Sequence, residues 1–438
     1  MLSGKTTWPR SRRSSSVLPE KPKKVLLIAY YFPPMGLGGV QRALAIARYL
    51  SGIGWQVMVL TSDFNDYPIL DRSLADKLPA DVEVISVADP VSMGKQVKDE
   101  NSYVLSRKNN FLRRFMRVPD SRLFWANNVY GKCLKKVRAF APDWIISTSP
   151  PPSVHLLARR LKLELKSGWL ADFRDPWAGD NQPELTFLHG LLNRTMEAKT
   201  MKDADLVTAV TAEHSLDLKR RYQAYADKIH HIPNGYDPID FRDIAECLPD
   251  EFVIAHGGTL VNYDYAGLFI DALVRLADES EEFKKRFRFH QIGSLTEPIH
   301  KLLKSDVSST IDVEFSGYLS HRKTLRELGG ASALVVFSGV AEGVELNMPG
   351  KLYEALYFDK PLLAMFRQSS PAMGVITGLA EVYHLDPEDK EQIRSQVKTL
   401  FEKHISGNLR IESRRDQISQ YSRKAQTERM ADLMGRLR

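Results

Sequence analysis

A proline-glycine break followed by a short helix carries the residues of this chain that are best suited to chemistry. The segment 345–361 reads ELNMPGKLYEALYFDKP and predicts a helix that begins near Gly350 and ends before a strand over 361–366. The first backbone N–H groups of a helix are unpaired and its dipole is positive there, so Gly350 and Lys351 together suit a phosphate. Glu354, one turn further on, could accept hydrogen bonds from a ribose diol. The alternative is an ordinary surface helix with an ordinary loop before it.

A glycine-rich turn lies closer to the N-terminus, between a predicted strand at 24–31 and a predicted helix. It reads GLGG over 36–39, and the dinucleotide-binding motif fails because position 41 is Gln where Gly or Ala is needed. The sequence contains no GxxxxGK[ST] loop either. Gly38 and Gly39 still offer backbone N–H groups at a helix N-terminus, which suits a phosphate or a sugar oxygen. The alternative is a turn that serves only the fold.

A charged cluster follows another predicted strand, in the segment ADFRDPW over 171–177. Asp172 and Asp175 flank Arg174 and would either hold its guanidinium in place or contact the hydroxyls of an acceptor. The alternative is a buried structural salt bridge at the end of a strand, because charged clusters serve both purposes. His155 is interpreted as a helix-packing residue.

The elements that must position these residues alternate along the chain. Short apolar runs such as KVLLIAYY and WQVMVLTS, each joined to a helical pattern, predict parallel strands with helices on both faces. A stretch rich in Pro, Asp and Gly interrupts the pattern near 234–250, after which a second series begins. The predicted fold class is therefore α/β, with two Rossmann-like domains that face each other across a cleft.

Length and composition place further limits on the protein. A chain of 438 residues is too long for one core, and 43% apolar with 26% charged residues is typical of soluble globular proteins. Cys133 and Cys247 form neither a disulfide framework nor a metal-ligand cluster, which indicates a reduced, cytosolic protein. The apolar runs are far shorter than the ~20 residues that span a bilayer. The N-terminus lacks the apolar segment of a secretory signal.

The net charge of +7 is concentrated in two stretches. Residues 101–140 contain ten Lys or Arg and one Asp, and residues 1–24 contain seven basic residues and one acidic residue. Within the first stretch, apolar and arginine side chains alternate over 107–117, which predicts contact with an anionic membrane surface. The alternative is a helix that packs its apolar side on its own domain. Nucleic acid is not expected, since no recognised binding motif accompanies the charge.

These segments, in this order, resemble the family-4 retaining glycosyltransferases, whose two facing Rossmann-like domains form the GT-B architecture. The resemblance extends from about Lys24 to Arg438. It rests on YYFPPMGLGGVQR, TSPPPSVH, ADFRDPW, HIPNGYD, HGGTL, FSGYLSHRKTL and PGKLYEAL. The chain is most similar to the subgroup with ADFRDPW, whose members often build polysaccharides and surface glycans.

The resemblance implies a domain organisation and a donor site shared between the halves. The predicted segments are a disordered basic tail (1–23), an N-terminal acceptor domain (24–235), a linker (236–250), a C-terminal nucleotide-sugar donor domain (251–412) and a helix that returns to the N-terminal domain (413–438). The residues expected around the donor are Gly38 and Gly39 over the diphosphate, Gly258 and Thr259 near the diphosphate and sugar, Tyr318 and Leu319 beside the nucleobase, Gly350 and Lys351 at the phosphates, and Glu354 at the ribose.

Several positions depart from the pattern of the family. Members often carry a Glu eight residues before the second one, but position 346 is Leu, so Glu345 beside it is the candidate for the sugar hydroxyls. The Arg and Lys that neutralise the leaving diphosphate in many members correspond here to Thr259 and Ala266. The cationic role would then fall to Lys351, Arg174 or Arg322. The residues expected to act in catalysis are Arg174, Asp172, Lys351 and Glu345.

The activity that the resemblance implies is retaining transfer of a sugar from a nucleoside-diphosphate sugar to a lipid-linked or glycan acceptor. UDP is favoured over GDP as the nucleotide. A helix N-terminus and a lysine can neutralise the leaving group, so no metal or other cofactor is expected. The expected location is cytoplasmic, with peripheral contact on the inner face of the cytoplasmic membrane. Two other functions stay open: a nucleotide-sugar 2-epimerase, and a non-catalytic GT-B protein that binds nucleotides as a partner subunit.

Overall fold

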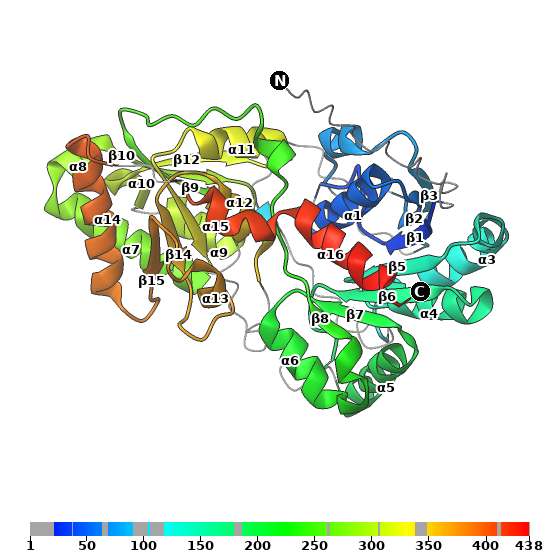
Figure 1. Cartoon of the computed structure of the whole chain (residues 1–438). Helices are drawn as coiled ribbons and strands as arrows, with labels where there is room; N and C mark the ends of the chain where they lie inside the picture. Colours follow the sequence, from blue (N-terminus) through cyan, green and yellow to red (C-terminus); the bar gives the residue numbers. More distant parts are fainter. Residues whose placement is uncertain are drawn as a thin grey trace, which may run out of the picture.

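Two large sheets of parallel strands, one from each half of the chain, lie side by side (Figure 1). The predicted α/β class is therefore confirmed. The structure is a computed structural model. The residues that it describes are 22–36, 38–63, 69–90, 104–105, 118–178, 186–260, 263–304, 307–337, 348–409 and 413–437.

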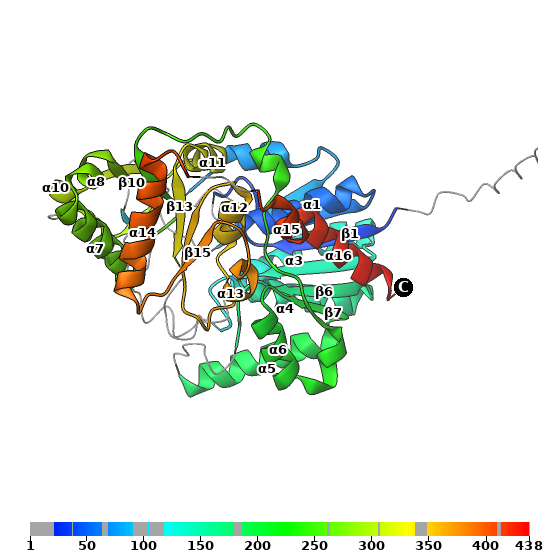
Figure 2. The same cartoon turned by 60° about the vertical axis from the view of Figure 1, so that its left-hand side comes forward.

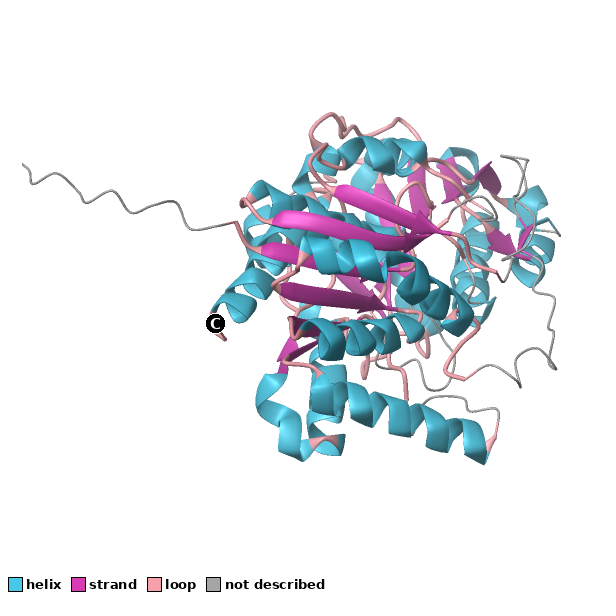
Figure 3. Cartoon of the chain, turned by 90° about the vertical axis from the view of Figure 1, so that its right-hand side faces the viewer, coloured by secondary structure: helices cyan, strands magenta, loops and turns pink. Residues whose placement is uncertain are grey.

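The N-terminal sheet has seven strands in the order β3-β2-β1-β5-β6-β7-β8, and each pairing is parallel. Figure 3 shows these strands side by side between layers of helices. A parallel sheet covered on both faces needs apolar side chains on both, which explains the continuous apolar runs in the sequence. The strands are β1 (Lys24–Ala29), β2 (Gln56–Ser62), β3 (Glu83–Val87), β5 (Trp144–Ser149), β6 (Gly168–Phe173), β7 (Leu206–Ala209) and β8 (Ile229–His231).

Successive residues of β1 enter opposite cores, as the alternation of side chains along a strand requires. Leu26 and Ile28 pack under α3, α4, α5 and α6, while Val25 and Leu27 pack under α1 and the last helix, α16 (Arg423–Gly435). The helices of this half are α1 (Val40–Gly52), α3 (Leu123–Phe140), α4 (Ser153–Leu165), α5 (Phe187–Asp203) and α6 (Ala212–Arg221), with 3₁₀ turns η1 (Arg72–Lys77) and η2 (Gln223–Lys228).

The C-terminal sheet has six parallel strands in the order β12-β10-β9-β13-β14-β15. One face is covered by α7, α8, α9 and α14, and the other by α11, α12 and α13. The strands are β9 (Phe252–Gly257), β10 (Phe287–Ile292), β12 (Asp312–Gly317), β13 (Ala333–Phe337), β14 (Leu362–Met365) and β15 (Val382–Leu385). The helices are α7 (Tyr263–Glu279), α8 (Glu281–Arg286), α9 (Glu297–Lys304), α10 (Val307–Thr310), α11 (His321–Gly329), α12 (Gly350–Tyr357), α13 (Met373–Ile376) and α14 (Lys390–Ile405).

The last helix crosses back to the N-terminal sheet (Figures 1 and 2). The 3₁₀ turn η3 (Pro238–Phe241) lies between β8 and β9. At the end of the chain, α15 (Arg415–Ile418) and η4 (Ser419–Tyr421) lead into α16 (Arg423–Gly435), whose Met430 and Met434 are buried in the core beneath α1. The crossing is fixed at its start, where the Arg423 N–H donates to the Tyr236 carbonyl over 2.8 Å.

Three short strands were not predicted from the sequence. β15 holds only four residues and three of them are half-buried, so it lacks the continuous apolar run of its neighbours. β4 (Val104–Leu105) and β11 (Leu295–Thr296) pair with each other across a long distance in the sequence and leave no local pattern.

Candidate functional site

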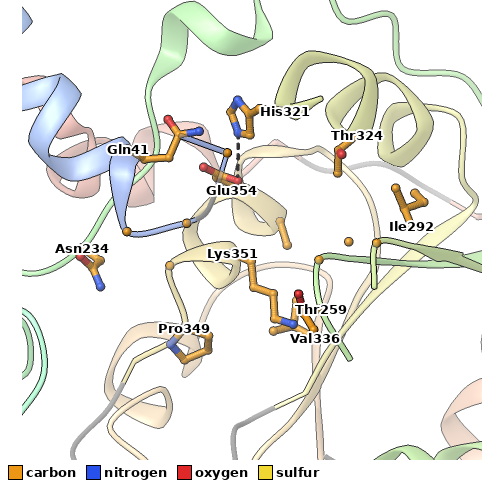
Figure 4. A pocket seen from close by; sticks show the side chains of 18 of the residues that line it. Gln41, Asn234, Thr259, Ile292, His321, Thr324, Val336, Pro349, Lys351 and Glu354 are labelled. Carbon is orange, nitrogen blue, oxygen red and sulfur yellow. Dashed lines mark ion pairs between the residues drawn. The ribbon is translucent and has the colours of Figure 1, made fainter. Parts of the chain in front are cut away.

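A cavity of about 650 Å³ lies between the two halves, where the carboxyl ends of both sheets meet (Figure 4). Its walls come from segments that follow strands. Arg174–Asp175 come directly after β6 and Gly258–Thr259 directly after β9, while Gly38–Gly39 end the longer loop between β1 and α1. Ligands of parallel α/β sheets bind at this edge, because the connecting loops there leave a crevice. The cavity is therefore the candidate site.

The N-terminus of α12 points its lysine into this cavity. Pro349 precedes the helix in an extended conformation, and its carbonyl accepts from the Leu352 N–H over 3.1 Å. The N–H groups of Gly350 and Lys351 come before it, where a helix offers no carbonyl of its own to accept them. Lys351 Nζ lies 2.8 Å from Nε2 of His256, at the end of β9. Figure 4 shows Lys351 and Glu354 on successive turns of the same helix.

A buried chain of hydrogen bonds sets the protonation of His256. Gln291 donates from its amide nitrogen to the Gly258 carbonyl over 3.0 Å, so its amide oxygen is left to accept. His256 Nδ1 lies 2.8 Å from that oxygen and must carry the proton, which leaves Nε2 as an acceptor for Lys351. Burial, reinforced by the charge of Lys351, lowers the pKa of His256, so its ring is neutral.

Lys351 therefore has a neutral partner. Burial lowers the pKa of its ammonium to about 8, and no carboxylate within the described ranges pairs with it. A cation without a counter-charge, at a helix N-terminus inside a cavity, is a site for an anion.

The turn after β9 requires glycine. Gly258 has φ +104°, in the left-handed region that other residues avoid. Gly293 has φ +124°, and a Cβ at this position would lie 2.5 Å from the Gly258 carbonyl oxygen. The close contact of these two turns holds the Gly258 carbonyl, which accepts from the Gln291 amide.

Glu354 faces the cavity from the second turn of α12 and is held by an imidazole and a guanidinium. His321 Nε2 lies 3.3 Å from one carboxylate oxygen (Figure 4). Arg423 Nη2 donates to the other oxygen over 3.0 Å. Burial alone would raise the pKa of Glu354, but His321 and Arg423 outweigh burial and lower it to about 2. The carboxylate is therefore ionised and oriented before any ligand binds.

Arg174 lines the cavity and is bound to backbone carbonyls. It donates to the Ser149 carbonyl over 2.7 Å, to Pro150 over 3.2 Å and also to Gly39. The guanidinium thereby ties the glycine turn before α1 to the end of β5. Burial is the main cause that lowers its pKa.

The expectation that Asp172 faces a substrate is not met by the geometry. Its carboxylate is fully buried, does not line the cavity and pairs with Arg42 in two hydrogen bonds of 2.8 and 2.9 Å. Thr148 and Thr208, its neighbours in register on β5 and β7, donate over 2.8 and 2.7 Å. Asp172 thus belongs to a buried structural ion pair, which was the alternative in the sequence analysis. Its partner is Arg42 and not Arg174.

The residues expected around a donor do lie together. All of them line the one cavity: Gly38, Gly39, Gly258, Thr259, Tyr318, Leu319, Gly350, Lys351 and Glu354. Tyr318 also donates from its hydroxyl to the Gly36 carbonyl across the cavity over 3.1 Å. Of the other expected residues, Arg322 pairs with Asp243 on the surface and does not line the cavity.

Three predictions lie outside the described residues. These are the role of Glu345, the membrane contact of segment 107–117 and the disordered tail, whose residues 1–21 are not described. In the described part of the chain, no three His, Cys, Asp or Glu side chains gather as a metal ion would need, and no helix is long and apolar enough to cross a membrane.

The sequence analysis missed two residues that orient Glu354. His321 stands in the FSGYLSHRKTL segment, where its place directly after a predicted strand end was the available signal. Arg423 comes from α16, 69 residues after Glu354, and nothing in its local sequence marks it.

Comparison with known proteins agrees with this geometry. Residues 37–239 match the family model described as Glycosyltransferase Family 4, which covers less than half of the chain. A search of curated proteins finds no match.

Solved structures match nearly the whole chain. Sucrose-phosphate synthase from Thermosynechococcus elongatus is 13% identical, with 95% of this chain and 99% of that chain covered and a TM-score of 0.64. A glycosyltransferase from Rickettsia africae ESF-5 is 15% identical, with 94% and 98% covered and a TM-score of 0.62. HepE from Anabaena in complex with UDP-glucose is 14% identical, with 94% and 99% covered and a TM-score of 0.63. These likenesses confirm the expected GT-B fold.

Proposed function

We propose that this protein is a family-4 glycosyltransferase that moves a sugar, with retention, from a nucleoside-diphosphate sugar to a lipid-linked or glycan acceptor. The observation that carries the proposal is Lys351 at the N-terminus of α12, inside the cavity between the two halves, where no carboxylate of the described residues pairs with it. The family match in the N-terminal half and the GT-B fold support the same class of enzyme.

The proposed donor is a UDP-sugar. HepE from Anabaena was solved with UDP and with UDP-glucose, and it shares the fold of this chain. In our proposal the diphosphate lies between Lys351, the first N–H groups of α12 and the glycine turn Gly38–Gly39. Glu354 accepts hydrogen bonds from the ribose hydroxyls, and Tyr318 and Leu319 lie beside the base.

The proposed reaction forms a bond from an acceptor hydroxyl oxygen to the anomeric carbon and breaks the bond from that carbon to the diphosphate. The proton of the hydroxyl leaves with the diphosphate. Negative charge grows on the β-phosphate as its bond breaks, so Lys351 and the helix N–H groups lower the barrier. In this proposal Lys351 takes the place of the Arg and Lys that positions 259 and 266 lack. Ala266 is buried and apolar.

Asp175 is the proposed contact for the acceptor. Its side chain is exposed and lines the cavity beside Arg174, on the wall formed by the N-terminal sheet. Arg174 acts by holding the glycine turn and by its positive charge near the diphosphate. Glu345 remains the proposed contact for the sugar hydroxyls.

The proposal is tested by thermal unfolding with UDP, GDP, ADP, CMP and NAD. A ligand at 100 times its Kd adds ~2.7 kcal/mol of stability, and UDP is expected to give the largest shift. Glu354→Ala should weaken UDP binding about 10–100-fold, since charged hydrogen bonds contribute about 1.5–3 kcal/mol. An absence of stabilisation by any nucleoside diphosphate would contradict the proposal.

Incubation with the donor alone separates transfer from epimerisation. A 2-epimerase converts the nucleotide sugar without an acceptor, whereas a transferase needs an acceptor for turnover beyond slow hydrolysis. Product analysis that shows an epimerised donor would replace the proposed reaction. UDP binding without any turnover on glycan and lipid-linked acceptors would favour a non-catalytic partner protein.

A further inference from the structure

Helix α5 presents a contiguous apolar surface to solvent at its N-terminal end. Phe187 is 82% exposed, Leu188 61%, Leu191 50% and Leu192 38%. Their spacing of one, four and five residues places them on one face over two turns. Single exposed leucines are common on proteins, but four neighbouring large side chains mark an interaction surface. We call this surface, made of these four residues, the α5 tip.

The rest of the same helix face is basic. Arg194, Lys199 and Lys202 are exposed and follow the α5 tip along one side of the helix. The two acidic residues of α5 point elsewhere: Glu197 is fully buried, and Asp203 pairs with Arg159. The exposed charge of α5 is therefore of one sign, directly beside an apolar end.

The inner face of α5 is firmly attached, so the α5 tip cannot be buried by a small rotation of the helix. Asn193 accepts a hydrogen bond from the Trp177 indole over 3.1 Å. Glu197 accepts from the Ala178 N–H over 3.2 Å, from the Tyr222 hydroxyl over 2.7 Å and also from Arg221. Both Figures 1 and 2 show α5 at the lower edge of the molecule, beside α6.

These contacts also tie α5 to the cavity. Trp177 and Ala178, which contact α5, follow Arg174 and Asp175, both of which line the cavity. The segment 174–178 therefore contacts the cavity at its start and α5 at its end.

We propose that the α5 tip docks on an anionic bilayer surface, with its four apolar side chains in the interface and Lys199 and Lys202 against the lipid headgroups. Apolar residues next to basic ones on one helix face are the pattern of proteins that lie on membranes. The single sign of the charge favours anionic lipid over a protein partner, whose surface would carry mixed charge. This surface differs from segment 107–117.

The docking surface has a consequence for the substrate, and this consequence rests on the proposed function. If the α5 tip holds the cavity next to a bilayer, the acceptor would be a lipid-linked glycan whose anchor stays in the membrane. The docking itself does not depend on the enzyme activity.

Sedimentation with vesicles tests the docking. The full chain is mixed with vesicles of phosphatidylglycerol and phosphatidylcholine, or of phosphatidylcholine alone. We expect binding to the anionic vesicles, a loss of at least ~10-fold in Phe187→Gln/Leu188→Gln, and a loss of roughly 5–30-fold in Lys199→Gln/Lys202→Gln. Leu163→Gln is the matched control, because Leu163 is 58% exposed on α4 and has the charged Glu164 beside it. It should bind like the wild type.

Three results would overturn the proposal: no sedimentation of the wild type with anionic vesicles, equal binding by Phe187→Gln/Leu188→Gln, or an equal loss in Leu163→Gln. A dimer that forms without lipid and is lost in Phe187→Gln/Leu188→Gln would assign the α5 tip to a second copy of the chain. Thermal shifts with UDP are recorded for each variant. A variant that keeps the UDP shift of the wild type but loses vesicle binding shows that only the docking surface is affected. Vesicle binding by the wild type without any UDP shift contradicts only the proposed function.

Discussion

Lys351 carries a positive charge that the described protein does not neutralise. Its polar partner, His256, is kept neutral by burial. The Nδ1–H of this ring donates to the Gln291 amide oxygen, so Nε2 is left to accept a hydrogen bond from Lys351. A carboxylate in place of His256 would cancel the charge and close the site to anions. The neutral histidine orients the ammonium and leaves its charge for a ligand.

The depressed pKa of Lys351 predicts that donor binding depends on pH. The ammonium loses its proton near pH 8, and binding of a diphosphate favours the charged form. UDP affinity should therefore fall by about tenfold for each pH unit above ~8, accompanied by proton uptake on binding. Calorimetric titration in buffers of different ionisation enthalpy measures both effects.

Lys351→Arg is the control for this titration, because a guanidinium stays charged over the whole range. Its UDP affinity should be nearly independent of pH between about 7 and 9. A wild-type profile as flat as that of the arginine variant would show that Lys351 is not the group that titrates.

Glu354 gives a prediction for stability at acidic pH. Its pKa in the folded protein is about 2, below the ordinary value of 4.5, so its ionised form stabilises the fold above about pH 4.5 and this contribution is lost as the pH falls toward 2. Glu354→Gln should lower the free energy of unfolding at pH 7 by about 2–3 kcal/mol, and by less than half of that near pH 3. Urea unfolding at a series of pH values measures the difference. Glu402→Gln, at an exposed position of α14, should change little. A constant difference between the wild type and Glu354→Gln would contradict the prediction.

At the scale of the element, the end of β6 separates two charged residues that are close in sequence. Asp172 is still within the strand, where β5 and β7 each provide a threonine that donates to its carboxylate. Arg174 follows the last residue of the strand and turns toward the cavity. The strand thus anchors α1 through Asp172 and Arg42, and its following loop builds the cavity wall.

Asp172→Asn should therefore destabilise the fold without changing the chemistry. Removal of the carboxylate leaves Arg42 as a buried charge without its partner, which costs about 3–5 kcal/mol. Urea unfolding should show this loss, while kcat of the folded enzyme stays close to that of the wild type. Asp175→Asn should behave in the opposite way, with little loss of stability and a large loss in kcat/KM. A large drop in kcat for a stable Asp172→Asn enzyme would show that Asp172 acts in catalysis.

At the scale of the whole molecule, the cavity exists only because the two halves meet. Tyr318 reaches Gly36, and the His321 N–H donates to Asp71 over 2.7 Å, so both contacts join the C-terminal half to the N-terminal half. A Cβ on Gly36 would overlap the Tyr318 hydroxyl, which explains the glycine there. The last helix, α16, adds Arg423 to the same junction.

Local sequence patterns predict the parts of this assembly that are built locally. The apolar runs predicted the long strands of both sheets. The Pro-Gly break predicted the start of α12 and the positions of Lys351 and Glu354 on it. The partners of Asp172 and Glu354 could not be predicted, because Arg42 and Arg423 lie 130 and 69 residues away in the sequence. Their contacts depend on the packing of helices that only the complete fold defines. β15 was missed for a related reason, since a short, half-buried edge strand has no continuous apolar run.

The most direct test of the central claim compares UDP with UMP in calorimetric titrations of the wild type, Lys351→Ala and Lys323→Ala. If Lys351 holds the β-phosphate, the wild type should prefer UDP by at least ~10-fold, since a charge-assisted contact is present only with the diphosphate. Lys351→Ala should lose most of this preference and bind UMP within about threefold of the wild type, while Lys323→Ala, at an exposed position of α11, keeps it. An unchanged preference for UDP in Lys351→Ala would contradict the account.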